Sequence, residues 1–280
     1  MPRFAVVGHV EWIEFGRVAH VPTAGEIVEA ADAFEEAAGS GAVAAVQIAR
    51  LAGAVDFFTA LAGDERGRRS AQRLEELGVT VHAAWRAGTQ RHGFCHLDDG
   101  GERTITIVGE RRVAHGLDDL PWGRLAGADA IYVTGGDAAA MRAARRARRL
   151  IATPRAAGGV KAAGIQVDAL VGSARDRLEA LDAESLTPAP TLVVHTRGDQ
   201  GGEWHGVERR SGTWQAAQLP GPRRDAYGAG DSFAGGFTYA LGCGMDVEAA
   251  LELAARCGAA NMTGRGPYAG QLGADDLGAD

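Results

Sequence analysis

An acidic residue directly after a glycine-rich turn is the part of this sequence best suited to chemistry. The turn lies in the segment DAYGAGDSFAGGF (residues 225–237), and the small and apolar residues that follow predict a helix over Ser232–Leu241. A glycine turn that opens a helix leaves several backbone N–H groups free, and the helix dipole favours negative charge beside them. We therefore expect an anion-binding turn at Gly228, Ala229 and Gly230.

Asp231 completes this turn and allows two interpretations. At the start of the helix it could act as a cap, with its carboxylate accepting backbone N–H bonds. The second interpretation is implied by a family resemblance described below, in which the carboxylate takes a proton from a hydroxyl group that attacks a phosphorus atom. Charge builds up on the phosphoryl oxygens in such a reaction, and fixed N–H donors are suitable partners for that charge.

A single lysine, Lys161, restricts the ways in which the chain can bind a nucleotide. A Walker A loop needs Gly-Lys followed by Ser or Thr, whereas Lys161 lies between Val160 and Ala162. The sequence therefore excludes a P-loop site. No Gly-x-Gly-x-x-Gly follows the first predicted strand, so the phosphate loop of a dinucleotide-binding Rossmann domain is also missing.

The charge balance and the cysteines bear on partners and location. A net charge of −7 argues against nucleic acid or an anionic membrane as the main partner. The arginine-rich residues 141–150 are interpreted as a solvated helix face. No apolar run has the length of a membrane span. Three cysteines without CxxC spacing, Cys95, Cys243 and Cys257, are typical of free thiols, so we expect a cytoplasmic protein.

The elements that must position the turn follow from hydrophobic periodicity. Phe4–Val7 predicts a buried strand, and residues 42–51 predict a small-residue helix after a glycine turn. Strands and helices then alternate, which favours a mainly parallel sheet with helices on both faces, a three-layer α/β/α architecture. The other expected elements are strands over 55–61, 130–134, 164–167 and 192–195, and helices over 67–77, 137–150 and 173–182.

Two segments interrupt this alternation and predict a small separate sheet. Residues 10–37 contain short apolar stretches among prolines, glycines and glutamates, and residues 86–108 contain two strand-like runs joined by a Gly-rich hairpin. We expect these segments to form one β-sheet that acts as a lid over a cleft. The whole chain, residues 1–280, is predicted to be a single domain, in which an exposed lid sheet could pair with a second copy.

The segment 225–237 resembles the signature of the ribokinase-like carbohydrate kinases, the PfkB family, which is approximately Asp-Thr-x-Gly-Ala-Gly-Asp-x-Phe. The resemblance implies that Asp231 is the general base and that the Gly228–Gly230 amides hold the transferring phosphoryl group. It also implies that Asp225 helps to bind a monovalent cation such as K⁺ in members that use one. Ala226 departs from the usual Thr or Ser.

Further segments resemble the nucleotide half of these kinases. VVHTRGDQG (193–201) is similar to a strand that ends in Thr-x-Gly-x-x-Gly, although a plain strand-to-turn glycine cluster would look the same. RCGAANMTGRG (256–266) is similar to the helix and loop around the adenine. The resemblance implies an ATP site with contacts from Thr196, Gly198, Gly201, Gly258 and Asn261.

The metal position departs from the family pattern. Ser173 and Asp176 stand where the family usually has Asn-x-x-Glu, which organises Mg²⁺ and phosphate through water. The resemblance therefore implies a Mg²⁺ site at these two residues. A helix N-cap followed by an acidic first turn is the alternative.

The sugar half departs further from the family pattern. Residues 38–45, AGSGAVAA, resemble the Gly-Gly-x-Gly-x-Asn segment over which the sugar lies, with Val43 in place of Asn. Relatives commonly place a substrate-binding Asp near Ile13, where this chain offers two glutamates. The substrate-binding residues that the resemblance implies are Glu11, Glu14, Gly39, Ser40, Gly41, Asp137 and Asp231.

Together these motifs predict an ATP- and Mg²⁺-dependent kinase that phosphorylates a hydroxyl group, expected to be a hydroxymethyl group, of a sugar or related small molecule. A nucleoside kinase of the same family and a kinase-fold protein that binds without catalysis remain open. Zinc sites are weaker interpretations. His9 and Glu11 lack the Pro-Cys-x-x-Cys of a deaminase, and His92 and His96 would lie ~13 Å apart on a strand.

Overall fold

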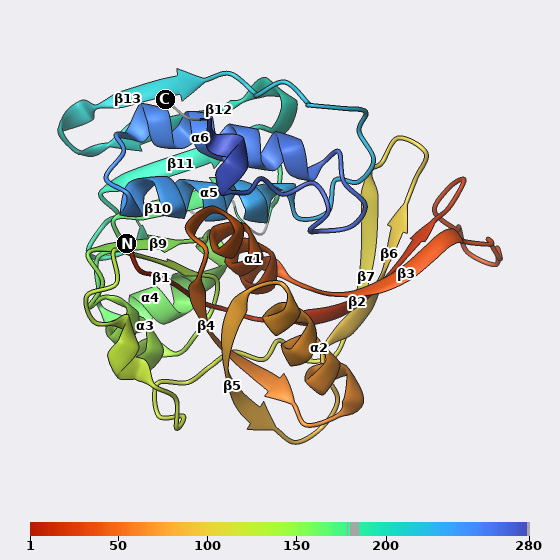
Figure 1. The fold of residues 1–280 in the computed structure, drawn as a ribbon, viewed down its shortest axis with the longest axis horizontal. Coiled ribbons are helices and arrows are strands. Elements are labelled where there is room, and N and C mark those ends of the chain that lie inside the picture. Colours follow the sequence, from red (N-terminus) through yellow and green to blue (C-terminus); the bar gives the residue numbers. More distant parts are fainter. Residues whose placement is uncertain (178, 180–184, 279–280) are drawn as a thin grey trace.

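Two β-sheets organise the chain in the computed structural model, which describes residues 1–177, 179 and 185–278 (Figure 1). The larger sheet has the strand order β13-β12-β11-β10-β9-β8-β1-β4-β5, and the smaller has the order β3-β2-β6-β7. Neighbouring strands from β11 to β5 are parallel, and β12 and β13 add an antiparallel edge. The strands are β1 (Phe4–Val7), β2 (Glu11–Arg17), β3 (Ala31–Ala38), β4 (Val55–Ala62), β5 (Val79–Arg86), β6 (His92–Leu97), β7 (Arg103–Val108), β8 (Ala130–Val133), β9 (Arg149–Ala152), β10 (Ala169–Ser173), β11 (Leu192–Thr196), β12 (Gly202–Gly206) and β13 (Ser211–Trp214).

Alternate side chains of β1 face opposite sides of the large sheet, and different helices cover each side. Phe4 and Val6 belong to a buried cluster with helices α1, α2, α5 and α6, whereas Ala5 and Val7 belong to a second cluster with α3 and α4. The predicted three-layer α/β/α architecture is thereby confirmed. The helices are α1 (Ser40–Ala52), α2 (Glu65–Glu76), α3 (Ala138–Ala144), α4 (Ala157–Ala163), α5 (Ala229–Gly242) and α6 (Val247–Asn261). In the part of the chain that the structure describes, no helix combines the length and apolar character needed to cross a bilayer.

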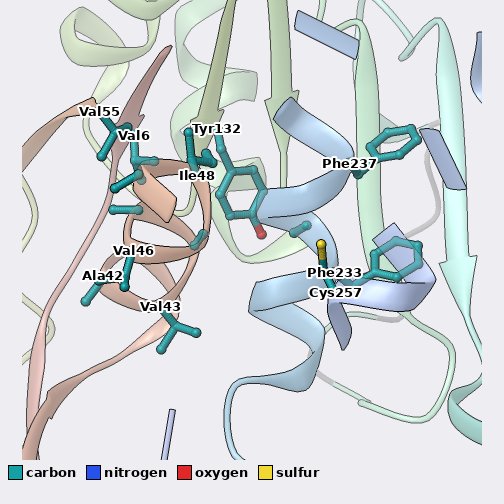
Figure 2. Packing of buried hydrophobic residues seen from close by; sticks show 14 of the residues in the cluster. Val6, Ala42, Val43, Val46, Ile48, Val55, Tyr132, Phe233, Phe237 and Cys257 are labelled. Carbon is teal, nitrogen blue, oxygen red and sulfur yellow. The ribbon is translucent and has the colours of Figure 1, made fainter. Parts of the chain in front are cut away.

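Small residues let α5, which follows the glycine turn, pack closely against its neighbours. A Cβ atom on Gly235 would lie 2.9 Å from the carbonyl oxygen of Ala44 on α1. A Cβ atom on Gly236 would lie 2.6 Å from Sγ of Cys257 on α6. Figure 2 shows Cys257 and Phe233 among the buried residues of this cluster. Close packing on both sides fixes where α5 begins, and therefore where its turn lies.

The smaller sheet consists of two hairpins joined by a parallel pair of strands. β2 pairs antiparallel with β3, β6 pairs antiparallel with β7, and β2 lies parallel to β6. The prediction of one small sheet from residues 10–37 and 86–108 is confirmed, except that Arg86 ends β5 of the large sheet. In Figure 1 this small sheet extends to the right of the large one.

Several local predictions in the second half of the chain are wrong. The helix expected over 137–150 stops at Ala144, because Leu150 and Ile151 are completely buried in β9, between β8 and β10. Residues 164–167 form an irregular link instead of a strand. The helix expected over 173–182 is not present in residues 173–177, and residues 178 and 180–182 lie outside the described part of the chain. Strands β5, β12 and β13 were not predicted.

The large sheet changes direction at β1, which pairs with β4 on one side and β8 on the other. In open parallel sheets, ligands bind beyond the carboxyl ends of the strands at such a switch point. Here β1 ends at Val7 and β8 ends at Val133. The residues that follow these two strands therefore mark the edge of the sheet where a ligand site is expected.

Candidate active site

The glycine turn leaves the first turn of α5 uncapped. Gly228 is the N-cap residue, with a left-handed φ of 80°, and among the described residues no side-chain hydrogen bond caps this end of the helix. Asp231 is the third residue of the helix, so the interpretation of Asp231 as its cap is wrong. The first-turn N–H groups and the helix dipole can therefore act on a ligand anion.

Asp231 is a half-buried carboxylate whose proton affinity is strongly altered. Burial raises the pKa of Asp231 to about 6, and the negative charge of Glu179 acts in the same direction. A hydrogen bond with Ser40 and the guanidinium charges of Arg103 and Arg155 oppose this rise in pKa. A carboxyl group with a pKa close to neutrality is well suited to accept a proton and release it again at physiological pH.

The first turn of α1 lies directly against the glycine turn of α5. The N–H of Gly39 donates a hydrogen bond to the hydroxyl oxygen of Tyr227 at 3.2 Å, and a Cβ atom on Gly228 would lie 2.9 Å from Cγ1 of Val43. The place at which the family pattern has Asn is therefore occupied by a completely buried valine. Gly41 is required for packing, because a Cβ atom there would lie 2.8 Å from the backbone nitrogen of His9.

Asp225 connects the start of the motif to the loop after α6. Its carboxylate is buried and accepts hydrogen bonds from the N–H of Tyr227 at 2.7 Å and the N–H of Gly266 at 3.0 Å. Burial raises the pKa of Asp225 above its usual range. Arg17, Arg224 and Arg265 line a pocket of ≈ 230 Å³ beside this carboxylate.

The small sheet contacts the same motif through its β6–β7 hairpin. Ala226 donates its N–H to the carbonyl oxygen of Gly101 at 3.0 Å, and the carbonyl oxygen of Ala226 accepts a hydrogen bond from Arg103 at 2.7 Å. Glu102 forms an ion pair with Arg223 at 2.8 Å. The hairpin therefore lies against residues that immediately precede the glycine turn of α5.

Glu11 is brought to the switch point of the large sheet, whereas Glu14 is not. The carboxylate of Glu11 is buried, accepts a hydrogen bond from Arg91 at 2.7 Å and lies 3.5 Å from Nε2 of His9. These partners hold the pKa of Glu11 at about 2 against the effect of burial, so the group is ionised. Glu14 pairs instead with Arg66 at 3.2 Å.

Asp137 has the structural role of a helix cap. It is the N-cap residue of α3, and its Oδ1 accepts hydrogen bonds from the N–H of Ala140 and the N–H of Gly116, both at 2.8 Å. These bonds lower the pKa of Asp137, although partial burial opposes them. Binding of a sugar hydroxyl by this carboxylate stays a prediction.

Glu179 is a residue of the site that sequence reasoning missed. It accepts a hydrogen bond from Arg155 at 3.0 Å and another from the backbone N–H of Ser173 at 2.8 Å. Asp176 also pairs with Arg155. The hydroxyl of Ser173 accepts a local bond from the N–H of Arg175 at 3.2 Å. The signal lay in the spacing, because Asp176-x-x-Glu179 fits Asn-x-x-Glu with one departure instead of two.

The residues assigned to the nucleotide lie in turns and helix contacts. Thr196 ends β11, and Gly198 and Gly201 adopt left-handed φ values of 63° and 75° in the turn that follows. Gly258 on α6 packs against α5, and the completely buried Asn261 donates a hydrogen bond to the carbonyl oxygen of Pro267 at 2.7 Å. Their contacts with ATP stay predictions.

A large, mainly parallel sheet that carries a second, smaller sheet defines the class of proteins with the ribokinase-like fold. Solved structures agree with this class. A ribokinase from Giardia lamblia aligns with a TM-score of 0.80 and 17% identity over 99% of this chain and 98% of that chain. The Arabidopsis thaliana ribokinase complexed with ribose and ATP gives a TM-score of 0.78 and 18% identity over 98% and 97% of the two chains. At such identities these structures show the fold.

The sequence model described as pfkB family carbohydrate kinase matches residues 1–158 and 166–272. The chain therefore belongs to the pfkB family and is a sugar kinase, as the resemblance predicted. A curated relative, the ATP-dependent ribose-1-phosphate kinase of Halopiger xanaduensis, is 28% identical in an alignment that covers 92% of this chain and 91% of the relative.

Proposed function

We propose that the protein transfers the γ-phosphoryl group of ATP to a hydroxymethyl group of a sugar, with Asp231 as the general base. The observation that carries this proposal is a half-buried carboxylate with a pKa of about 6 next to the uncapped N–H groups of α5. Relatives named ribokinase and ribose-1-phosphate kinase support ATP as the donor and a pentose as the framework of the acceptor.

The proposed reaction is an in-line displacement at the γ-phosphorus. The acceptor oxygen forms its bond to phosphorus while its proton passes to the carboxylate of Asp231. The bond between the γ-phosphorus and the bridging oxygen breaks, and its electron pair leaves with ADP. The N–H groups of Gly228, Ala229 and Gly230 stabilise the charge that develops on the equatorial oxygens.

Carboxylates at the end of β10 suit the Mg²⁺ that accompanies ATP. Among the described residues no group of three or more His, Cys, Asp or Glu side chains could hold a metal without other ligands. Mg²⁺ is commonly held by one or two carboxylates together with substrate phosphates, and Asp176 and Glu179 provide such a pair. When bound, the ion would neutralise charge on the ATP phosphates.

Asp225 fits a bound K⁺ less well. Both oxygens of its carboxylate already accept backbone N–H bonds, and three arginines line the adjoining pocket. A monovalent cation there would meet like charge, so no step of the proposed reaction depends on it.

The function is tested by measuring ADP formation from Mg²⁺-ATP with a panel of acceptors. The panel contains free pentoses and hexoses, their monophosphates, and nucleosides, and ³¹P NMR identifies the product. We expect turnover with a sugar or sugar phosphate. Turnover only with nucleosides would show a nucleoside kinase. No ADP formation above background with any acceptor would contradict the proposal and favour a protein that binds without catalysis.

The pH dependence of the reaction should report the ionisation of Asp231. Only the ionised carboxylate can accept a proton, so kcat/KM is expected to fall as pH drops through about 6. In the Ser40→Ala variant this fall should occur at a higher pH, since the hydrogen bond with Ser40 lowers the pKa of Asp231. Ser211→Ala, an exposed change on β13, is the control. An unchanged profile in Ser40→Ala would refute the assigned contact.

A further inference from the structure

Arg111 has a partly buried guanidinium group that forms no ion pair with a carboxylate among the described residues. Its Nη2 donates a hydrogen bond to the carbonyl oxygen of Thr134 at 2.6 Å and lies 3.0 Å from Nδ1 of His9. Its Nε is buried without a hydrogen-bond partner. Among the described residues, no carboxylate oxygen lies within 4.0 Å of Arg111. Burial lowers the pKa of Arg111, which reflects the cost of keeping this charge away from water.

Neighbouring groups do not neutralise this charge. The negative charge of Glu11 acts on Arg111, but its carboxylate is hydrogen-bonded to Arg91. Burial lowers the pKa of His9, and the charge of Arg111 acts in the same direction, so the imidazole is neutral at physiological pH. The bond from Arg111 to Nδ1 agrees with this, because that nitrogen must then act as an acceptor. Arg91, Glu11 and Arg111 together therefore carry one excess positive charge.

The position of Arg111 places this charge in the ligand crevice. His9 and Thr134 follow β1 and β8, the two strands that flank the switch point of the sheet. The charge of Arg155 acts on both Arg111 and Asp231, which connects the basic group to the catalytic carboxylate. The acidic end of the site, around Asp231, suits Mg²⁺-ATP and the attacking hydroxyl. The basic end of the site, around Arg111, is therefore available to bind a different part of the acceptor.

We propose that Arg111 binds a phosphate group that the sugar acceptor already carries, so that the enzyme converts a sugar monophosphate into a bisphosphate. This inference rests on the proposed kinase function. Nη1 of Arg111 donates no hydrogen bond to any described residue. Its two N–H groups can therefore donate charge-assisted hydrogen bonds to phosphate oxygens. Arg91 is a positioning residue, because its hydrogen bond to Glu11 balances the negative charge of that carboxylate.

The kinetic test compares a pentose monophosphate with the corresponding free pentose. Wild type is expected to prefer the phosphorylated acceptor. Loss of charge-assisted hydrogen bonds in Arg111→Gln should lower the ratio of the two kcat/KM values about 100-fold, mainly through KM for the phosphorylated acceptor. Arg111→Lys should restore part of the ratio. Arg124→Gln is the matched control, because Arg124 pairs with Asp56 at the amino end of β4.

Four results would overturn the inference. The first is a wild-type preference for the free pentose, and the second is an equal loss for both acceptors in Arg111→Gln. The third is a rise in KM for ATP with no change in KM for the acceptor, which would assign Arg111 to the nucleotide. A preference for sugar acids over sugar phosphates would also contradict the choice of phosphate.

A binding measurement separates this inference from the kinase reaction itself. Calorimetry without ATP should show that the pentose monophosphate binds wild type and binds Arg111→Gln about 100-fold more weakly. Binding that depends on Arg111 without any ADP formation would contradict the proposed function and leave the phosphate site standing. ADP formation from pentoses, together with equal binding of the pentose monophosphate to wild type and Arg111→Gln, would support the kinase function and contradict the phosphate site.

Discussion

Asp231→Asn is expected to reduce kcat by at least about 10³-fold while the protein folds and binds ATP normally. General-base catalysis typically contributes about 10²–10⁴-fold, and Asn cannot take the proton from the attacking hydroxyl. Asn keeps an oxygen that can accept the hydrogen bond from Ser40, so the geometry of the first turn is preserved. Stopped-time ADP assays and equilibrium binding of ATP measure the two effects separately.

The same substitution should make the protein more stable at neutral and alkaline pH. The folded-state pKa of Asp231, about 6, lies above its ordinary value of 3.8, so the folded protein binds this proton more tightly than the unfolded chain. Proton binding by Asp231 therefore stabilises folded wild type. This contribution grows as pH falls from about 6 towards 4, and it is lost above pH 6. Two pKa units correspond to about 3 kcal/mol, and solvent access at a half-buried site reduces this to about 1–3 kcal/mol.

Chemical denaturation of wild type and Asp231→Asn at pH 5 and pH 8 checks the predicted direction of this stability difference. The advantage of Asp231→Asn should be larger at pH 8. Asp275→Asn, an exposed change in the last short helical turn, should alter neither activity nor stability. Turnover within a few-fold of wild type would remove Asp231 from its role as base. Lower stability of Asp231→Asn at pH 8 would show that burial does not penalise its charge.

Gly228→Ala is expected to lower kcat by about 10²–10³-fold and to destabilise the fold. Gly228 has a left-handed φ of 80°, which costs an alanine about 1–2 kcal/mol. The new Cβ atom would also lie 2.9 Å from Cγ1 of Val43, and such overpacking costs about 1–3 kcal/mol. Any shift that relieves the overlap moves the N–H groups of the anion-binding turn, and loss of one such donor typically costs about 10²–10³ in kcat.

Gly53→Ala separates backbone strain from damage to the turn. Gly53 also has a φ of 80°, at the end of α1, and a Cβ atom there would meet open space, with no contact within 4 Å. This variant should lose only about 1–2 kcal/mol of stability and keep its activity. Adding Val43→Ala to Gly228→Ala should recover part of the activity, because it removes the overlap. Equal activity of Gly228→Ala and wild type would show that the turn does not act on the phosphoryl group.

The sequence predicted those parts of the protein whose cause is local. Alternating apolar runs indicated the three-layer sheet, and two interruptions indicated the small second sheet, because hydrophobic periodicity follows directly from which face of an element is buried. The segment at 225–237 indicated the glycine turn and the following helix. A single lysine excluded a P-loop without any structure.

Errors arose where neighbours distant in the chain decide the outcome. The helix predicted over 137–150 ran into residues 149–152, which burial between β8 and β10 makes a strand. The alternative interpretation of Asp231 as a cap also fails, because the left-handed Gly228 places it inside the first turn of the helix. Glu179 was missed although its spacing from Asp176 fits the family pattern, and its contacts with Arg155 and Ser173 show where it lies.

The tertiary structure alone decided which charged side chains lie at the switch point of the sheet. Glu11 and Glu14 lie three residues apart, but the first meets Arg91 at the switch point and the second meets Arg66 on α2. Arg111 looked like any other arginine in an arginine-rich chain. Whether such a charge is neutralised or left available depends on long-range pairing, which composition and spacing do not contain, because the partners come from strands and loops that only folding brings together.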